Sequence, residues 1–444
     1  MAGLSAVERA ATRDDTGTGD TGTGDAGTGE ADRQTWSERF QAVRGESLAL
    51  AAPLTAEDQQ VQSMPDVSPT KWHLAHVTWF FETFLLAPGL HGYEPFDPAF
   101  GFLFNSYYEA VGERHPRPQR GLLSRPPLEQ VMAYRAHVDA AMERLIAEAS
   151  EADWLKLEPL LELGLNHEQQ HQELILMDIK HVFWTNPLLP AYAAAAPRAA
   201  ARAAELQWLD FAGGLVGMGH DGSGFAFDNE GPRHKLWIEP FRLASRLATC
   251  GEYLAFIEDG GYRRPELWLS DGWASVGLQG WEAPLYWRRS EGGWRIFTLS
   301  GEAPLDEAEP VSHLSHYEAD AFARWSGARL PTEAEWETAA LSAPASGHLA
   351  DRRRYHPEPA RGEGLQQLIG DLWEWTMSPY TPYPRYRPPE GAVGEYNGKF
   401  MSGQMVLRGG AAVTPAGHVR LTYRNFFPPA ARWAFSGVRL ARDA

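Results

Sequence analysis

The sequence contains a single cysteine, Cys250, among its 444 residues. One cysteine cannot form an intramolecular disulfide, and it excludes metal sites that are built from several cysteines, such as Cys-rich zinc sites and iron–sulfur clusters. We therefore expect a reducing, cytoplasmic compartment, and we interpret Cys250 as a small buried hydrophobic residue.

The chain also lacks any run of about eighteen apolar residues, which is the length that a membrane-spanning helix needs. Its first residues, MAGLSAVERAATRDD, contain neither the basic region nor the apolar stretch of a secretory signal peptide. These absences predict a soluble protein that does not interact with membranes.

Basic residues are scarce relative to acidic ones, with 40 Lys and Arg against 58 Asp and Glu and a formal net charge of −18. Binding to a phosphate backbone requires a basic surface, so this composition argues against a nucleic-acid partner. We expect small-molecule substrates instead.

A chain of this length exceeds what one hydrophobic core usually supports, so two domains are expected. Residues 1–34 include the tract TRDDTGTGDTGTGDAGTGEAD at 13–33, whose few apolar groups predict a disordered acidic tail. Residues 35–195 contain four segments with helical periodicity, which predict an all-α four-helix bundle. After an Ala-rich linker, residues 207–444 combine short aromatic strands with Gly-rich turns, which predict an α+β domain.

Two helices are expected within this second domain. They cover SHYEADAFARWSG at 315–327 and TEAEWETAA at 332–340. In the second, Thr332 and Glu335 have the spacing of a capping box, in which each side chain binds the other residue's backbone N–H.

The most informative motif is GLNHEQQHQELILMD, in which His167 and His171 are four residues apart. Positions i and i+4 lie on one face of a helix with their Cβ atoms about 5–6 Å apart, so both imidazoles can bind one ion. The segment SPTKWHLAHVTWFFE offers a third imidazole, His76, from another expected helix. Three neutral imidazoles leave coordination positions open for chemistry. We interpret His73 and His181 as polar residues that pack at the edge of the bundle.

The same motif also reads as HExxH, the pattern of zinc metalloproteases, in which Glu168 would be the general base. Such proteases usually take a third ligand downstream of the pair, and no matching histidine pattern follows His171. This absence weakens the protease alternative.

Several motifs carry a resemblance to known families. The segments PVSHLSHYEADAFARWSGARLPTEAEWETAA, IGDLWEWTMSPY, VLRGG and FSGVRLARD resemble the formylglycine-generating-enzyme or sulfatase-modifying domain, a variant of the C-type-lectin fold. The N-terminal bundle resembles the DinB-like metal-binding domain. In this order the two are similar to the iron-dependent sulfoxide synthases of ergothioneine biosynthesis, the EgtB family, over about residues 35–443. Formylglycine generation is not expected, because that chemistry uses cysteines near the C-terminus and RLTYRNFF contains none.

The resemblance implies a non-haem Fe(II) cofactor and O₂ as co-substrate. Enzymes of this family join a cysteine sulfur to the imidazole of hercynine, which is Nα-trimethylhistidine, and oxidise the sulfur to a sulfoxide. His76, His167 and His171 match the positions of the iron ligands. Gln170 matches a position that contacts the histidine substrate, and Glu168 is then a structural carboxylate.

The resemblance also implies substrate contacts. In HPRPQRGLLSRP, Arg117 and Arg120 match two arginines that hold the carboxylates of the thiol substrate, a role that suits guanidinium geometry. For hercynine, whose quaternary ammonium donates no hydrogen bond, recognition is expected from aromatic faces and shape. The segment RNFFPPAARW matches the hercynine-binding segment of the family and offers Asn425, Phe426, Phe427 and Arg432. The better-known branch has Asn-Trp-Asp where this chain has Asn-Phe-Phe, so this chain lacks the carboxylate of that aspartate.

The proton donor distinguishes two branches of the family. The branch that uses γ-glutamylcysteine has a tyrosine shortly before VLRGG, where this chain has Gln404. The motif FNSYYEA carries Tyr107 and Tyr108 instead, as in the branch that uses free cysteine. A phenol with a pKa of about 10 is a suitable proton donor. We therefore predict cysteine as the thiol, with γ-glutamylcysteine as the alternative.

Two further functions are compatible with the sequence. One is that of an ovothiol-type sulfoxide synthase acting on histidine, although such enzymes typically carry a further methyltransferase domain. The second is that of a noncatalytic lectin-like binding module, suggested by the fold expected for the C-terminal domain.

Overall fold

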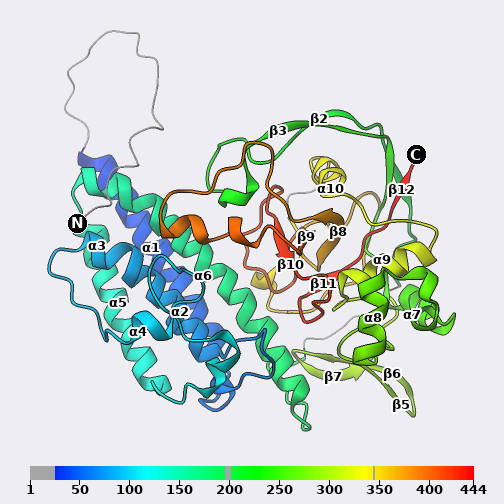
Figure 1. Ribbon diagram of the computed structural model, residues 1–444, viewed down its shortest axis with the longest axis horizontal. Helices are drawn as coiled ribbons and strands as arrows, with labels where there is room; N and C mark the ends of the chain where they lie inside the picture. Colours follow the sequence, from blue (N-terminus) through cyan, green and yellow to red (C-terminus); the bar gives the residue numbers. More distant parts are fainter. Residues whose placement is uncertain (1–25, 196–201, 344–345) are drawn as a thin grey trace.

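The computed structural model describes residues 26–195, 202–343 and 346–444. In Figure 1 the helices of the N-terminal half lie on one side of the molecule and the strands of the C-terminal half on the other. Helix α6 (Glu151–Thr185) runs between the two halves and contacts both. Within the described residues no helix combines the length and apolarity needed to cross a bilayer.

The predicted four-helix bundle is confirmed. Its long helices are α1 (Ala26–Ala51), α2 (Thr70–Phe81), α5 (Leu128–Glu148) and α6. All twelve residues of α2 are buried, because this helix packs against both α5 and α6. Shorter helices join them: η1 (Asp58–Gln60), η2 (Glu82–Leu86), α3 (Ala87–Gly89), α4 (Phe100–Leu103) and η3 (Arg117–Leu122).

The start of α1 differs from the expectation of a disordered tract at residues 13–33. Helix α1 begins at Ala26, so the expectation is wrong for residues 26–33. The cause is a tertiary contact: the Arg33 guanidinium donates hydrogen bonds to the Ala149 carbonyl at 2.6 Å and to the Glu151 carboxylate at 2.6 Å. Residues 13–25 lie outside the described residues.

The C-terminal half is the predicted α+β domain. Its largest sheet in the described part has the strand order β10-β9-β8-β11, and β1-β4-β12, β5-β6-β7 and β2-β3 form smaller sheets. The bounds of the strands are β1 (Trp208–Phe211), β2 (Gly214–Met218), β3 (His234–Ile238), β4 (Phe241–Ala244), β5 (Trp287–Ser290), β6 (Gly293–Thr298), β7 (Gly301–Pro304), β8 (Trp373–Pro379), β9 (Met405–Arg408), β10 (Asn425–Phe427), β11 (Ser436–Gly437) and β12 (Ala441–Asp443). The helices are α7 (Cys250–Glu258), α8 (Ser270–Gln279), α9 (His316–Trp325) and α10 (Glu333–Ala340), with short turns η4 (Asp228–Glu230), η5 (Gly261–Arg263), η6 (Pro265–Leu267), η7 (Ala350–Arg352), η8 (Ala392–Glu395) and η9 (Gly398–Phe400).

Capping boxes in the sequence account for the starts of α7, α9 and α10. The predicted capping box at α10 is present: Thr332 accepts from the Glu335 N–H at 3.1 Å, and the Glu335 carboxylate accepts from the Thr332 N–H at 2.7 Å. Helix α9 has the same arrangement with Ser315 and Glu318. Cys250 is buried at the start of α7, as expected from the sequence.

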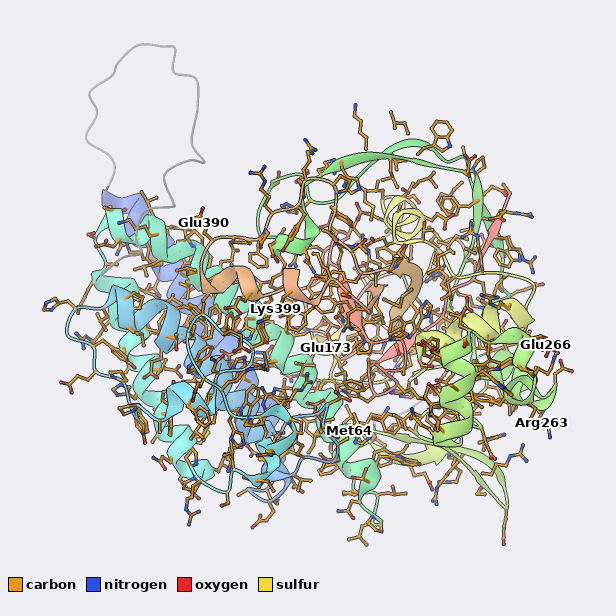
Figure 2. The ribbon with its side chains drawn as sticks, viewed as in Figure 1. Met64, Glu173, Arg263, Glu266, Glu390 and Lys399 are labelled. Carbon is orange, nitrogen blue, oxygen red and sulfur yellow. The ribbon has the colours of Figure 1, made fainter. Side chains whose placement is uncertain are left out.

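The two halves meet along α6. Glu173 of this helix accepts hydrogen bonds from the Trp373 indole at 2.7 Å and from the Thr414 hydroxyl at 2.5 Å. Figure 2 shows Glu173 near the centre of the molecule, where the bundle faces the C-terminal domain. Residues 391–400 make a second crossing, since the Glu395 carboxylate accepts from the backbone N–H groups of Glu109 and Ala110. Residues of both crossings line one cavity, among them Glu173 and Tyr396.

Candidate metal centre and substrate pocket

Three histidines converge where α2 faces α6. His76 projects from α2, and His167 and His171 project from one face of α6. One ring nitrogen from each lies within 4.8 Å of the others. The predicted triad is therefore brought together, because i and i+4 on one helix meet a third residue on its neighbour.

The hydrogen bonds of these rings define which nitrogens are free. His76 Nδ1 lies 2.6 Å from the Phe104 carbonyl and donates to it, which leaves the lone pair of Nε2 available. His76 Nε2 and both ring nitrogens of His167 have no hydrogen-bond partner within the described part of the chain. Buried polar atoms without partners are rare, and here they point to a missing ligand.

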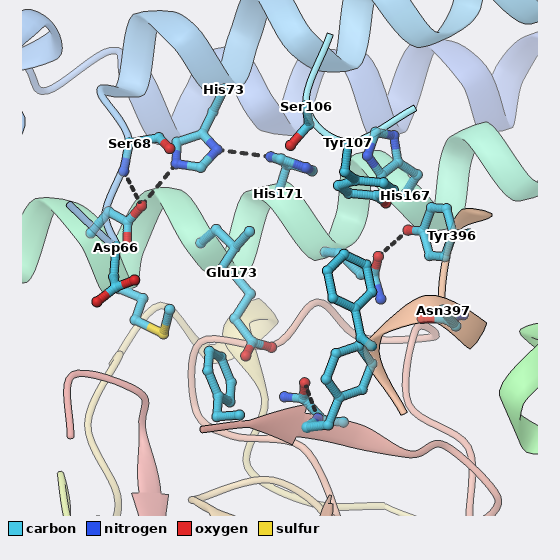
Figure 3. Close-up of a pocket in the computed structure, with 18 of the residues that line it drawn as sticks. Asp66, Ser68, His73, Ser106, Tyr107, His167, His171, Glu173, Tyr396 and Asn397 are labelled. Atoms are coloured by element: carbon cyan, nitrogen blue, oxygen red, sulfur yellow. Dashed lines mark hydrogen bonds and ion pairs between the residues drawn. The ribbon is translucent and has the colours of Figure 1, made fainter. Parts of the chain in front are cut away.

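His73 is buried within the bundle, so its expected place at the bundle edge is wrong. Its Nδ1 lies 2.8 Å from Nδ1 of His171, and its Nε2 lies 3.0 Å from the Asp178 carboxylate. The tautomers that satisfy these contacts have His73 Nε2–H donating to Asp178 and His171 Nδ1–H donating to His73. This chain, drawn in Figure 3, leaves Nε2 of His171 free to bind a metal. His181, in contrast, is a satisfied polar residue whose Nδ1 lies 2.6 Å from the Ser63 hydroxyl.

The protonation of the triad suits a metal site. Burial lowers the pKa of His76, His167 and His171, to about 3 for His167. The imidazoles are therefore neutral at physiological pH, as ligation requires. Three neutral imidazoles with free lone pairs fit Fe(II), which accepts nitrogen ligands and retains open positions beside them.

Glu168 does not take part in this site. Its carboxylate is fully buried and accepts from Arg44 at 2.9 Å, Arg135 at 3.1 Å and Ser47 at 2.7 Å. Burial would raise the pKa of Glu168, but the two guanidinium groups and the Ser47 hydrogen bond lower it below its ordinary value. A carboxylate held in this way cannot serve as a general base at the metal, so the geometry contradicts the protease alternative.

A cavity of about 320 Å³ opens beside the triad, between the bundle and the C-terminal domain. Its wall brings together residues from α2, α6, β10 and the loops at 104–122 and 391–404. The sequence-predicted residues that line it are His167, His171, Tyr107, Arg117, Arg120, Gln170, Asn425, Phe426 and Phe427.

The two arginines lie at one end of this cavity. Arg120 is 3% exposed, lies 3.3 Å above the Trp72 ring, and donates to the hydroxyls of Ser68 and Ser106. Among the residues that the structure describes, Arg120 forms no direct ion pair. Burial lowers the pKa of Arg120 well below its usual value, and the charge of the nearby Asp178 carboxylate acts in the opposite direction. Arg117 is exposed and donates to the Asp66 carbonyl. Arg120 is therefore a buried guanidinium that lacks a direct ion-pair partner among the described residues.

Gln170 of α6 and the three residues of β10 also line the cavity. The Gln170 side chain donates to the Tyr423 hydroxyl at 2.6 Å and accepts from the Tyr396 hydroxyl. Phe427 packs edge-on against Trp433, which also lines the cavity.

The expected substrate contact of Arg432 is not supported by its position. Its guanidinium forms two hydrogen bonds with the buried Glu318 carboxylate, at 2.8 and 2.9 Å, and lies over the Trp281 ring. Arg432 thus neutralises the carboxylate that caps α9, and this role occupies its hydrogen-bonding face.

The tyrosines differ in access to the cavity. Tyr107 lines it, whereas Tyr108 stacks behind Tyr107 at 4.6 Å and packs against Trp79 and Phe84 in the bundle core. Burial raises the pKa of Tyr107 above its ordinary value, so its hydroxyl keeps its proton at neutral pH. Tyr396, which the sequence reasoning missed, also lines the cavity, with its ring 5.6 Å from that of His167.

Glu173 is a second lining residue that was missed. Burial raises its pKa to about 7, although the hydrogen bonds from Thr414 and Trp373 act in the opposite direction. The sequence around Glu173 does not predict that it lines a cavity. The face of α6 that carries Glu173 becomes a cavity wall only because the C-terminal domain packs near it.

Comparison with known protein families agrees with this architecture. The family model of the DinB superfamily matches residues 39–175, and that of the sulfatase-modifying factor enzyme 1-like domain matches residues 193–361 and 354–444. The chain thus has a helical N-terminal domain followed by a formylglycine-generating-enzyme-like domain.

Several curated proteins are similar to this chain. The hercynine oxygenase of Mycobacterium tuberculosis is 34% identical over 414 residues, which cover 85% of this chain and 92% of that protein. The hercynine oxygenase of Mycolicibacterium smegmatis is 32% identical over 449 residues, covering 93% and 99%. The ergothioneine biosynthesis protein 1 of Schizosaccharomyces pombe is 28% identical over 232 residues, covering 49% and 28%.

These similarities extend across both domains and include the histidine triad within the matched region. They exclude the alternative of a noncatalytic lectin-like module, because the relatives over the full length are enzymes. The chain belongs to the hercynine oxygenase (EgtB) family of oxidoreductases.

Proposed function

We propose that this enzyme joins the sulfur of cysteine to the imidazole carbon of hercynine and oxidises that sulfur to a sulfoxide, using O₂. The reaction breaks one S–H and one C–H bond and forms one C–S and one S–O bond. One oxygen atom enters the sulfoxide and the other leaves as water. The four electrons taken up by O₂ come from C–S bond formation and from sulfur oxidation, two from each.

In this proposal His76, His167 and His171 hold Fe(II), which supplies the binding and activation of O₂. The chain's own contribution is to present three neutral donors and to leave the remaining positions facing the cavity. His73 and Asp178 fix the tautomer of His171, so that its free lone pair faces the metal.

Arg120 and Arg117 bind the carboxylate of the thiol substrate. The support is electrostatic: Arg120 is a buried cation without an ion-pair partner among the described residues, so an incoming carboxylate gains a strong charge-assisted hydrogen bond. Arg117 is exposed and adds a weaker contact at the rim.

Gln170 and the β10 residues bind hercynine. Gln170 is held in one orientation by Tyr423 and Tyr396, and Asn425 adds a second polar side chain to the cavity lining. Phe426 and Phe427 contribute aromatic faces, which attract a quaternary ammonium without hydrogen bonds.

Tyr107 donates the proton that the reaction requires. Of the predicted pair it is the residue that lines the cavity, and burial keeps its hydroxyl protonated. Tyr108 then supports Tyr107 by stacking behind it.

The observation that carries the proposal is the convergence of three histidines, with unpartnered ring nitrogens, on a cavity that also holds an unpaired arginine. The test reconstitutes the enzyme with Fe(II) without oxygen, admits O₂, and identifies products by mass spectrometry. Hercynine and histidine are each offered with cysteine and with γ-glutamylcysteine.

We expect hercynylcysteine sulfoxide as the main product and the highest kcat/KM for the pair hercynine and cysteine. A higher kcat/KM with γ-glutamylcysteine would contradict the thiol assignment. A higher kcat/KM with histidine would favour the ovothiol-type alternative.

A further inference from the structure

The segment between α4 and η3, all of which the structure describes, carries Tyr107 and has no helix or strand of its own. The bundle itself holds the residues on either side of Tyr107. Asn105 binds the backbone of Tyr108 through both ends of its amide, at 3.0 and 3.1 Å. Arg120 donates to the Ser106 hydroxyl at 3.0 Å. The backbone at Tyr107 and just after it is held by contacts from the C-terminal domain.

These contacts come from residues 391–400 of the C-terminal domain. The Lys399 ammonium donates to the Tyr107 carbonyl and lies 5.2 Å from the centroid of its ring. The Phe400 ring meets the Tyr107 ring edge to face at 5.4 Å, and the Tyr396 ring does so at 6.2 Å. Figure 3 shows Tyr396 of this segment beside Tyr107, and Figure 2 labels Lys399 where the segment borders the bundle. The C-terminal domain therefore encloses part of the Tyr107 side chain.

Glu395 of the same segment binds the turn that follows Tyr107. Its two carboxylate oxygens accept from the backbone N–H groups of Glu109 at 3.0 Å and of Ala110 at 2.8 Å. Lys399 donates to the same carboxylate at 2.8 Å. Burial acts to raise the pKa of Glu395, but the Lys399 hydrogen bond and the two backbone N–H groups lower it below its ordinary value. The carboxylate is thus ionised at neutral pH, which strengthens the hydrogen bonds that it accepts.

Small movements of this backbone matter for proton donation. A donor must lie within about 2.6–3.2 Å of the atom that receives its proton. The Tyr107 hydroxyl stands at the far end of its side chain, so a small rotation of the backbone displaces it by a larger distance. Displacement of a reacting group by about 1 Å can cost about a hundredfold in rate. Holding the turn after Tyr107 from both sides therefore serves the proton transfer.

We propose that Glu395 and Lys399 are positioning residues that hold Tyr107 where its hydroxyl can donate the proton. The inference rests on the proposed function, in which Tyr107 is the proton donor. Neither Glu395 nor Lys399 is among the described residues that line the cavity, so both act through Tyr107 and not by contact with substrate. The bundle supplies the donor, and the C-terminal domain sets its position.

The first test is Glu395→Gln, which keeps the shape of the side chain but replaces one accepting oxygen with an NH₂ group that cannot accept from a backbone N–H. Hydrogen exchange at the Glu109 and Ala110 amides should be faster in this variant, because the turn is freed. We expect kcat for the sulfoxide to fall about tenfold and the share of cysteine sulfinate to rise, since a misplaced donor acts like a missing one. Iron content and the dissociation constant for cysteine, both measured anaerobically, should stay within about twofold of wild type.

A double-mutant cycle with Tyr107→Phe separates positioning from other roles. If Glu395 acts only through the Tyr107 hydroxyl, adding Glu395→Gln to Tyr107→Phe should change neither the product ratio nor kcat any further. Effects that multiply in the double variant would show that Glu395 acts elsewhere and would overturn the proposal.

The matched control is Glu46→Gln. Glu46 of α1 also binds across the domain boundary, where it accepts from the Arg353 guanidinium at 2.7 Å, but neither residue is among the described residues that line the cavity. This variant should keep the wild-type product ratio. An equal shift in Glu46→Gln and Glu395→Gln would assign the effect to a loosened domain contact, and the positioning role would be wrong.

Lys399→Met is the second variant, and it decides the matter if Glu395→Gln does not fold. It keeps a similar length but removes the donor to the Tyr107 carbonyl, so the product ratio should shift toward cysteine sulfinate. A wild-type ratio in the folded variants, with sulfoxide still formed by the wild-type enzyme, would sink the inference and leave the proposed function standing. A wild-type enzyme that forms no sulfoxide would overturn both.

Discussion

Replacing Arg120 by methionine separates binding from stability. The side chain keeps a similar length and its packing over Trp72 but loses the guanidinium charge. A hydrogen bond to a charged group contributes about 1.5–3 kcal/mol, and about 1.4 kcal/mol corresponds to a factor of ten. The dissociation constant for cysteine should therefore rise about 10- to 150-fold. The free energy of unfolding should not fall, because Arg120 lacks an ion pair within the described residues and its burial is costly.

The assay titrates cysteine into the anaerobic Fe(II) enzyme and records thermal unfolding of the same samples. Arg117→Met is the control, since Arg117 is exposed and its loss should weaken cysteine binding about fivefold at most. Unchanged cysteine affinity in Arg120→Met would refute the carboxylate role. A fall in melting temperature of several degrees would show instead that Arg120 is structural.

Changing any one of the three cluster histidines to alanine should abolish stoichiometric iron binding, measured by metal analysis after anaerobic reconstitution; full iron in one variant would remove that residue from the ligand set. His73→Phe should retain stoichiometric iron but bind it about 10- to 100-fold more weakly, because His171 loses the partner that fixes its tautomer; an unchanged affinity in a competition titration would restore the packing interpretation. Tyr107→Phe should yield more cysteine sulfinate and less sulfoxide by mass spectrometry, and Tyr108→Phe should be milder; equal product ratios in both variants and wild type would remove Tyr107 as the donor. Burial lowers the pKa of His316 to about 4, so between pH 6.5 and 4 the unfolded chain binds a proton that the folded chain does not, and the free energy of unfolding decreases as the pH is lowered. Between pH 7.5 and 5.5, the free energy of unfolding of His316→Gln should therefore decrease by about 1.4 kcal/mol less than that of the wild type. Urea unfolding of the metal-free protein measures this difference, and equal decreases in both proteins would contradict it.

The parts of the site that the sequence predicted are those set by local geometry. His167 and His171 share a helix face at i and i+4, so their convergence requires only that the helix forms. His76 needed one further assumption, that its helix packs against theirs. The capping box of Thr332 and Glu335 is equally local, since both partners lie within one turn.

The parts that were missed or wrong depend on contacts between distant segments. Tyr423, the partner of the predicted Gln170, lies 253 positions after it in the sequence, and Thr414, which binds Glu173, lies 241 positions after Glu173. Arg432 looked available in the sequence because nothing near it reveals that Glu318, 114 positions earlier, is its partner. His73 was assigned to packing for the same reason, because its contact with His171 exists only once α2 and α6 are adjacent.

The most direct test of the central claim is isotopic. The Fe(II) enzyme is supplied with hercynine, cysteine and ¹⁸O₂, and the product is analysed by mass spectrometry beside a parallel reaction of His167→Ala. We predict a C–S bonded sulfoxide that carries one ¹⁸O atom on sulfur from the wild-type enzyme, and no such product from the variant. A sulfoxide without ¹⁸O from wild type, or labelled product at the wild-type rate from His167→Ala, would contradict the assignment of this chemistry to the three-histidine site.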